Sequence, residues 1–159
     1  MSDIFSKSER SRIMGLIKSK DTKIEKDFCS VLSSVFYPIG IRYRKHYSKL
    51  PGKPDIAFVK NRIAVFIDGD FWHGYKFKIQ KQRLPRRYWV KKIENNINHD
   101  REVNLKLRRM GWRILRIWEH EIKLKPEKAI EKIVKMITKN KELKIFPLHC
   151  QNRSQNYKL

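Results

Sequence analysis

Carboxylates, a histidine and bare aromatic rings lie close together between positions 55 and 74 of the chain. Asp55 begins one short apolar run, and the end of the next run carries the loop Asp68-Gly69-Asp70-Phe71-Trp72-His73. Two carboxylates held close in a basic protein indicate a hard-cation site, because Mg²⁺ usually takes one or two carboxylates together with waters and substrate phosphates. A phosphodiester would be its natural substrate. Taken alone, such a pair is more often a strand start and a turn, so the neighbouring residues have to decide.

Positioning this pair requires two strands that turn back on each other. Residues 55–59 and 63–67 are apolar runs typical of buried strands, and only residues 60–62 separate them. We therefore predict a hairpin that holds Asp55 near Asp68 and presents the following loop rigidly.

Apolar spacing and the Gly and Pro stop signals predict the remaining elements. Helices are expected from Thr22 to about Pro38, over 88–110 with Gly111 as the stop, and from Pro126, and a further strand over 112–118. Residues 41–47 alternate well enough for a strand, although an irregular loop fits them equally. This order predicts an α/β fold with a mixed β-sheet flanked by helices. A single domain is expected over residues 1–140, followed by a basic tail at 141–159.

The charge balance indicates a nucleic-acid partner. The 159 residues include 38 Lys and Arg against 16 Asp and Glu, which gives a formal net charge of +22, and a field of this sign attracts phosphates. An anionic membrane is the rival partner, but no run reaches the roughly 20 apolar residues of a spanning helix, and the N-terminus lacks the apolar core of a signal peptide. Cys29 and Cys150 are too few for a disulfide framework. We expect a soluble, cytoplasmic protein, with a monomer as the default.

A basic segment follows soon after the loop at residues 68–73. It contains no acidic residue and carries Lys76, Lys78, Lys81, Arg83, Arg86 and Arg87. A run of one sign is often only a solvated face, but beside the expected site it is suited to the DNA backbone. Contacts of this kind position a duplex rather than read its sequence. Tyr88 and Trp89 separate these residues from Lys91 and Lys92 and are more typical of helix packing than of base stacking.

Five motifs carry a resemblance to a known family. They lie at residues 10–14, 21–26, 50–55, 69–73 and 111–119 and read RSRIM, DTKIEK, LPGKPD, GDFWH and GWRILRIWE. Over roughly residues 5–138 the chain resembles the very short patch repair (Vsr) DNA mismatch endonucleases, which belong to the PD-(D/E)XK nuclease superfamily. The resemblance implies a restriction-endonuclease-like fold. It also implies Mg²⁺-dependent nicking of duplex DNA at T:G mismatches in very short patch mismatch repair, leaving a 5′-phosphate and a 3′-hydroxyl.

The resemblance also assigns roles to single residues. It makes Asp55 the central metal ligand and gives the backbone carbonyl of Ile67 to the same ion. Asp68 stands where zinc-containing relatives carry a histidine, and we expect it to bind the cation directly. His73 matches the catalytic histidine, and a neutral imidazole with an unperturbed pKa of about 6.5 can accept a proton from water near neutral pH. A lone histidine is more often structural, but this one follows the carboxylates closely.

Glu25 has two interpretations of equal weight. The sequence Thr22-Lys23-Ile24-Glu25 fits a capping box, in which the glutamate binds the backbone at the helix start. The resemblance makes Glu25 a catalytic-site carboxylate that orients water or metal near His73. The two roles are compatible.

The aromatic residues of the loop also have two interpretations. Phe71 and Trp72 are costly to expose, so packing in the core is their ordinary explanation. The resemblance implies instead that they act with Met14 as a wedge that enters the base stack beside a mismatch, where the weak pair lowers the cost of unstacking.

A structural zinc occurs in some members of the family, but this chain departs from that pattern. The matching neighbourhood holds Asp70, Tyr75, Phe77 and His120. The set lacks thiolates, and phenylalanine cannot bind zinc. We predict that no structural zinc is bound and that packing and charge hold the loop after His73.

Two other classes of function stay open. A restriction-type or structure-specific nuclease would cut matched DNA with the same core, and a noncatalytic DNA-binding protein would need only the basic face. Double-stranded DNA is the expected partner in every case. A functional link to a cytosine-5 methyltransferase or to mismatch-repair factors is a further expectation from the resemblance.

Overall fold

The computed structural model describes residues 8, 22–80 and 87–138. The described residues form the following elements: α2 (Lys23–Phe36), β1 (Arg44–Lys45), β2 (Ile56–Phe58), the 3-10 turn η1 (Val59–Asn61), β3 (Ile63–Asp68), α3 (Phe77–Gln80), α4 (Arg87–Arg109), β4 (Arg113–Trp118), α5 (Glu119–Leu124) and α6 (Pro126–Thr138).

The sheet is mixed and has the order β1-β2-β3-β4. β1 pairs with β2, and β2 with β3, in the antiparallel sense, whereas β3 pairs with β4 in parallel. The parallel register runs from Ile63 opposite Arg113 to Asp68 opposite Trp118. A parallel pair needs a long crossover connection, and α4 supplies it here.

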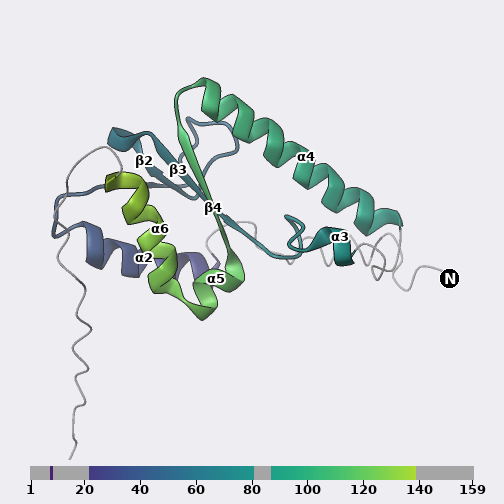
Figure 1. The fold of residues 1–159 in the computed structure, drawn as a ribbon, viewed down its shortest axis with the longest axis horizontal. Helices are drawn as coiled ribbons and strands as arrows, with labels where there is room; N and C mark the ends of the chain where they lie inside the picture. Colours follow the sequence, from purple (N-terminus) through teal and green to yellow (C-terminus); the bar gives the residue numbers. More distant parts are fainter. Residues whose placement is uncertain (1–7, 9–21, 81–86, 139–159) are drawn as a thin grey trace, which may run out of the picture.

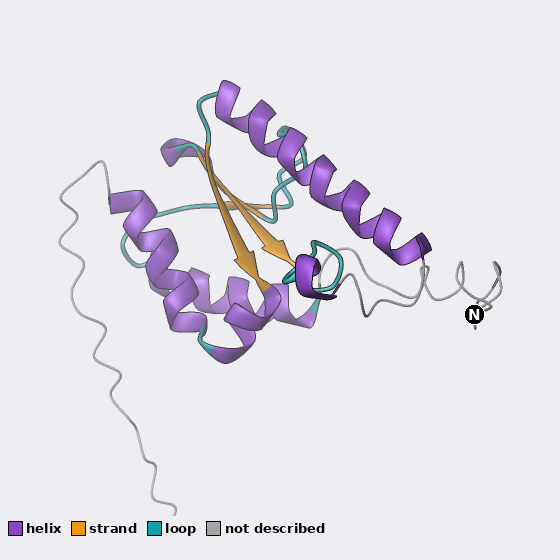
Figure 2. Cartoon of the chain, turned by 45° about the vertical axis from the view of Figure 1, so that its right-hand side comes forward, coloured by secondary structure: helices purple, strands orange, loops and turns teal. Residues whose placement is uncertain are grey.

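Helices cover both faces of the sheet. In Figures 1 and 2, α2, α5 and α6 lie on one side of the strands and α4 crosses the other side. Ile63 and Val65 of β3 pack in the core on the α2 side, while Ala64 and Phe66 pack with apolar residues of α4. Successive side chains of a strand point to opposite faces, so β3 delivers its odd-numbered residues to one layer and its even-numbered residues to the other.

The predicted hairpin, the three long helices and the last strand are confirmed. α2 begins after the N-cap Thr22, and it buries Phe28, Leu32 and Phe36 at the spacing of one helix face. α6 begins at Pro126, as predicted, and buries Ala129, Ile130, Ile133 and Ile137 at helical spacing. The α/β architecture with a mixed sheet flanked by helices is therefore confirmed.

Three details of the prediction are corrected. The strand expected over 41–47 is limited to Arg44–Lys45, because His46 adopts a left-handed backbone with φ of 43° that ends the pairing. The hairpin strand begins at Ile56 rather than at Asp55. The short helices α3 and α5 were not predicted.

Within the described residues, no helix combines the length and the apolar character needed to span a membrane. The basic tail expected at 141–159 lies outside the described residues.

Candidate functional site

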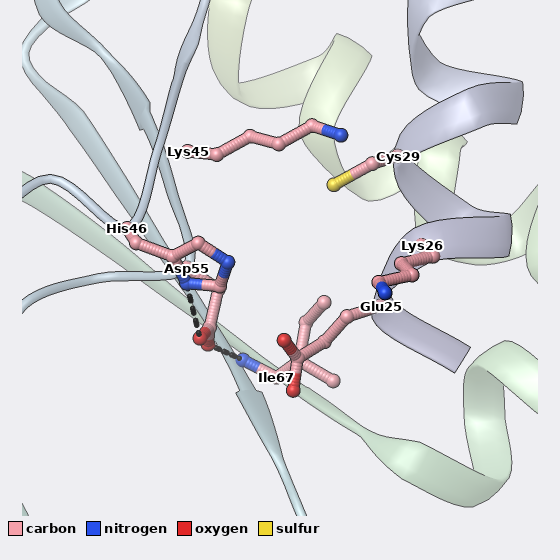
Figure 3. A pocket seen from close by; sticks show the side chains of 7 residues that line it. All are labelled: Glu25, Lys26, Cys29, Lys45, His46, Asp55 and Ile67. Carbon is pink, nitrogen blue, oxygen red and sulfur yellow. Dashed lines mark hydrogen bonds and ion pairs between the residues drawn. The ribbon is translucent and has the colours of Figure 1, made fainter. Parts of the chain in front are cut away.

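Three side chains meet on the α2 side of the sheet. Glu25 comes from the first turn of α2, His46 from the turn after β1 and Asp55 from the residue before β2 (Figure 3). One ligand atom from each lies within 4.8 Å of the other two. They share a cavity of about 10 Å³ that is also lined by Lys26, Cys29, Lys45 and Ile67. This group is called the carboxylate–imidazole cluster below.

Asp55 is the most perturbed carboxyl group of the cluster. Its side chain is 21% exposed, and its Oδ2 accepts the N–H of Ile67 at 2.7 Å. Burial raises the pKa of Asp55 to about 6, and the charge of Glu25 adds to the rise, while the hydrogen bond from Ile67 opposes it. A buried carboxylate disfavours its charged form in this way unless a positive partner arrives. The environment of Asp55 therefore favours cation binding.

Glu25 lies at the helix start and also lines the cavity of the cluster. The Thr22 hydroxyl accepts the backbone N–H of Glu25 at 3.2 Å and lies 3.1 Å from its Oε1, to which it donates. The helix start thus fixes the carboxylate that enters the cluster. Ile67 lines the same cavity, at the position where its carbonyl is expected to serve the ion.

His46 is a member of the cluster that sequence analysis missed. Its Nδ1 lies 4.0 Å from Oδ1 of Asp55. The residue was assigned to an alternating strand, in which its polar side chain carried no signal of its own. Only the turn that ends β1 brings it to the cavity.

A second charged group lies on the opposite face of β3. Nε and Nη2 of Arg116 donate to the two carboxylate oxygens of Asp68 at 2.5 and 2.7 Å. Nη2 of Arg116 also lies 2.9 Å from Oδ1 of Asp100 on α4. Nδ1 of His73 lies 2.7 Å from Oδ2 of Asp100 and 3.7 Å from Oδ1 of Asp68. This group is called the arginine-centred network below.

The structure does not bring Asp68 into the carboxylate–imidazole cluster. Asp68 follows Ile67 in β3, so its side chain points to the α4 side, and it is 3% exposed there. Both of its oxygens are bound by Arg116. The sequence placed Asp55 and Asp68 at one site, but they lie on two faces, and direct binding of the cation by Asp68 would require its carboxylate to leave the guanidinium.

The network sets the chemistry of His73. Burial lowers the pKa of His73, but the hydrogen bond to Asp100 and the charges of Asp68 and Asp100 outweigh it, so the pKa lies above its ordinary value. When Nδ1 donates to Asp100, the neutral ring carries its lone pair on Nε2. In that tautomer, Nε2 is the ring nitrogen that can accept a proton.

Asp100 and Arg116 are the other site residues that sequence analysis did not identify. Burial raises the pKa of Asp100, but the bond to His73 and the Arg116 guanidinium bring it below its ordinary value. One signal was available for Asp100: it lies between Ile93 and Leu107 on the apolar stripe of α4, where a carboxylate needs a partner.

The aromatic loop packs against the start of α4. Phe71 is 40% exposed, and its ring centroid lies 4.9 Å from that of Trp72 and 5.9 Å from that of Trp89. Asn96 donates to the Trp72 carbonyl at 2.9 Å. At Gly74, which has φ of 75°, an added Cβ would lie 2.7 Å from Ile97 Cδ1, so only glycine allows this approach. Trp89 packs as predicted, and its partners are the two loop aromatics.

Side chains considered above for zinc contact one another. Nδ1 of His120 lies 2.6 Å from Oδ1 of Asp70, and the Tyr75 ring lies 4.3 Å from the imidazole and 5.2 Å from the Trp118 ring. Phe77 begins α3. The set lacks thiolates and includes Phe77, which cannot bind a metal, so it does not fit zinc. A hydrogen bond and tilted ring contacts join the loop to the end of β4 and the start of α5.

Several predicted DNA contacts cannot be placed. Lys76 is exposed, and its Nζ lies 5.2 Å from the Tyr75 ring centroid. Lys78 belongs to α3 and Arg87 begins α4. The remaining predicted contacts lie outside the described residues, namely Met14, Lys81, Arg83 and Arg86.

Known proteins share this sequence pattern. Residues 2–79 match the family described as DNA mismatch endonuclease Vsr. The type II nicking enzyme V.NmeDIP of Neisseria meningitidis serogroup C is 35% identical over 146 residues, which span 91% of this chain and 96% of that protein. The type II nicking enzyme V.HpaIIP of Haemophilus parainfluenzae is 39% identical over 76% of this chain and 84% of its own length. The DNA mismatch endonuclease Vsr of Escherichia coli strain K12 is 36% identical over 75% of this chain and 74% of its own length.

Proposed function

Since the chain belongs to the DNA mismatch endonuclease Vsr family and is a DNA endonuclease, we propose that it nicks duplex DNA beside a T:G mismatch with the help of a divalent cation such as Mg²⁺. The products would be a 5′-phosphate and a 3′-hydroxyl, as very short patch mismatch repair requires. The protein would act as a monomer, and a link to a cytosine-5 methyltransferase would explain how such mismatches arise.

One observation carries the catalytic part of the proposal. The end of β3 separates two chemically different groups, with Asp55 bound to the N–H of Ile67 on one side and His73 beside Asp68 on the other. Asp55 and Glu25 would hold the cation, with the Ile67 carbonyl as the expected third oxygen. The bound cation would polarise the scissile phosphate and offset its charge.

His73 would act as the base. Its Nδ1 is held by Asp100 at 2.7 Å, which leaves Nε2 to take a proton from the attacking water. Asp100 and Arg116 would act through His73, by fixing its ring and balancing the charges around it. Asp68, a predicted cation ligand, would in this arrangement serve the base instead.

Mismatch recognition is supported by the aromatic loop. Phe71 is 40% exposed although it is backed by Trp72 and Trp89. An apolar ring that is both exposed and firmly supported is suited to entering a base step, and a mismatched step costs less to open. The lysines and arginines of 76–87 would hold the duplex by its phosphates.

A second candidate function is nicking of matched duplex at a defined sequence. The observation that favours it is that two similar proteins are named type II nicking enzymes. The same cation and base would cut either substrate, so only the choice of DNA separates the two functions.

The test is a nicking assay on two duplexes that differ only by one T:G mismatch, with Mg²⁺, in several flanking contexts. Asp55→Ala should lower the nicking rate by on the order of 10³-fold or more, while DNA binding is kept. Asp27→Ala is the matched control, because Asp27 is an exposed carboxylate on the same α2 helix.

Each outcome of the assay decides something. Nicking beside the mismatched thymine that is lost in Asp55→Ala supports the proposal. Equal nicking of the matched duplex favours the second candidate. Binding without cleavage in every context would overturn catalysis by this site, as would full activity of Asp55→Ala.

A further inference from the structure

His46 is held in an unusual backbone conformation beside the proposed cation site. Its φ is 43°, a left-handed value that is uncommon for a residue with a Cβ atom. The N–H of His46 donates to the Asp55 carbonyl at 2.9 Å, and the N–H of Tyr47 donates to the Pro54 carbonyl at 3.0 Å. These two bonds fix the turn to the residues that precede β2. Such strained conformations persist where the surroundings enforce them, and they concentrate at functional sites.

The turn points the imidazole at the Asp55 carboxylate, as Figure 3 shows. Their closest atoms are 4.0 Å apart, which is too long for a hydrogen bond. Two ligands that each lie about 2.1 Å from an octahedral ion are about 3.0 Å apart when adjacent and about 4.2 Å apart when opposite. The separation is thus one that two ligands of a single ion can have.

The cavity that these groups line is small. Its volume is about 10 Å³, close to the minimum that one water molecule needs. Figure 3 shows that Lys45, the nearest lysine on the β1 side, extends toward Cys29 rather than toward the Asp55 carboxylate.

We propose that His46 is a nitrogen ligand of the divalent cation held by Asp55 and Glu25, and that it makes the site bind Mn²⁺ and Co²⁺ more tightly than Mg²⁺. This inference rests on the proposed function, because it assumes that the cluster holds a cation. Mg²⁺ prefers oxygen ligands, whereas imidazole nitrogen favours first-row transition cations. A set of two carboxylates and one imidazole therefore selects against Mg²⁺.

The first measurement uses the full chain, Mn²⁺ and no DNA. Pulsed electron paramagnetic resonance on bound Mn²⁺ should detect the coupling of a coordinated ¹⁴N nucleus. Protein grown with ¹⁵N-histidine should show the ¹⁵N coupling in its place, which tests the proposal without any substitution. Bound Mn²⁺ that shows no nitrogen coupling would overturn it.

The second measurement assigns the nitrogen to His46. In His46→Gln the coupling should vanish, and the Mn²⁺ dissociation constant should rise by about tenfold or more, the loss typical of even an outer-shell partner. Mg²⁺ affinity, measured by competition, should fall less, so the preference for Mn²⁺ should shrink. His73→Gln and His99→Gln are matched controls that should keep the coupling. His99 is exposed on α4, far from the cluster in sequence and fold.

Other outcomes give the opposite answer. Equal losses of Mn²⁺ and Mg²⁺ affinity in His46→Gln, with thermal unfolding unchanged, would mean that the imidazole only positions Asp55. Loss of the nitrogen coupling in His73→Gln would show that His73, and not His46, is the nitrogen ligand, and it would overturn the proposal.

The inference and the proposed function fail separately. If Mn²⁺ binds through His46 but no duplex is nicked, the function is wrong and the site remains. If nicking depends on Asp55 but bound Mn²⁺ shows no nitrogen coupling, the function stands and the ligand assignment is wrong.

Discussion

A buried carboxylate lies on each side of β3, and the two carboxylates have different hydrogen-bond partners. On the α2 side, Asp55 receives one backbone hydrogen bond from Ile67, and burial raises its pKa to about 6. On the α4 side, Asp68 is more deeply buried but receives two bonds from the Arg116 guanidinium. The first carboxylate is ready for a positive ligand, and the second already has one supplied by the chain.

This difference distinguishes the proposed cation site around Asp55 from the arginine-centred network that contacts His73. A buried charge is costly unless it is paired, so the cluster around Asp55 gains from a cation. In the arginine-centred network, Arg116 pairs with both Asp68 and Asp100, so these contacts and the His73–Asp100 bond do not depend on a bound ligand. The comparison predicts opposite responses when charges are removed from the two faces.

The largest effect is expected from removing the arginine. Arg116→Met leaves Asp68 buried without its partner, which should lower the free energy of unfolding by roughly 3–5 kcal/mol. Urea unfolding at neutral pH measures it. The double variant Asp68→Asn/Arg116→Met should recover part of the loss, because no orphaned charge remains at position 68. A loss below about 1 kcal/mol in Arg116→Met would mean that the Asp68 carboxylate does not depend on its arginine partner, and the contrast with Asp55 would not hold.

On the other face, removing a charge should stabilise the protein. With its pKa raised from 3.8 to about 6, ionised Asp55 costs roughly 3 kcal/mol in the metal-free protein. Folding therefore favours the protonated form, and this contribution is fully present below pH 3.8 and is lost as the pH rises through about 6.

Asp55→Asn should accordingly be more stable than the wild type at pH 8 with a chelator, and the gap should close toward pH 4. Thermal unfolding across this range measures the difference. Asp27→Asn, at an exposed carboxylate, should show no such trend. Equal stability of Asp55→Asn and wild type at pH 8 would mean that the ionised Asp55 carboxylate does not destabilise the metal-free protein.

A third prediction concerns the link between the network and the base. In the wild type, the Asp100 carboxylate is hydrogen-bonded to His73 and raises the pKa of His73. Asp100→Asn removes this negative charge, so the pKa of His73 should fall. The single-turnover nicking rate should fall on the order of 10²-fold, and the acidic limb of its pH profile should move to lower pH. Arg101→Gln, at the exposed neighbouring position, is the control. A lower rate with an unmoved profile would mean that Asp100 does not act through His73.

The smallest effect is expected at the loop, outside both groups. Asp70→Asn weakens the bond to His120, and both side chains are partly exposed, so the unfolding free energy should fall by about 1 kcal/mol. Lys123→Ala, which breaks the exposed pair with Glu119, should cost less. Equal losses for these two variants would deny the Asp70–His120 bond a special role in holding the loop.

The sequence was sufficient for the elements that bury regular apolar faces. The hairpin and the helices α2, α4 and α6 follow from periodic burial and clear stop signals. The strand expected over 41–47 is shorter than predicted, because His46 leaves the extended conformation and no local sequence pattern indicates a left-handed histidine. The helices α3 and α5 are too short to show a period.

Within the site, single residues were easier to predict than their partners. The sequence named Asp55, Glu25 and His73 as candidate site residues because each lies in one of the motifs. The run 63–67 is apolar on both faces, as buried strands are, so nothing in it showed that Asp68 would turn away from Asp55. Arg116 and Asp100 become neighbours only through the parallel pairing of β3 with β4 and the return path of α4.

Three successive contacts tie the aromatic loop to one helix. Asn96, Ile97 and Asp100 of α4 contact Trp72, Gly74 and His73. Ring, turn and imidazole are thus all held by one helix. Under the proposed function, a duplex that meets this edge would meet three groups whose spacing α4 sets. The ease with which the DNA step deforms, which a mismatch increases, would then set how readily the scissile phosphate reaches His73.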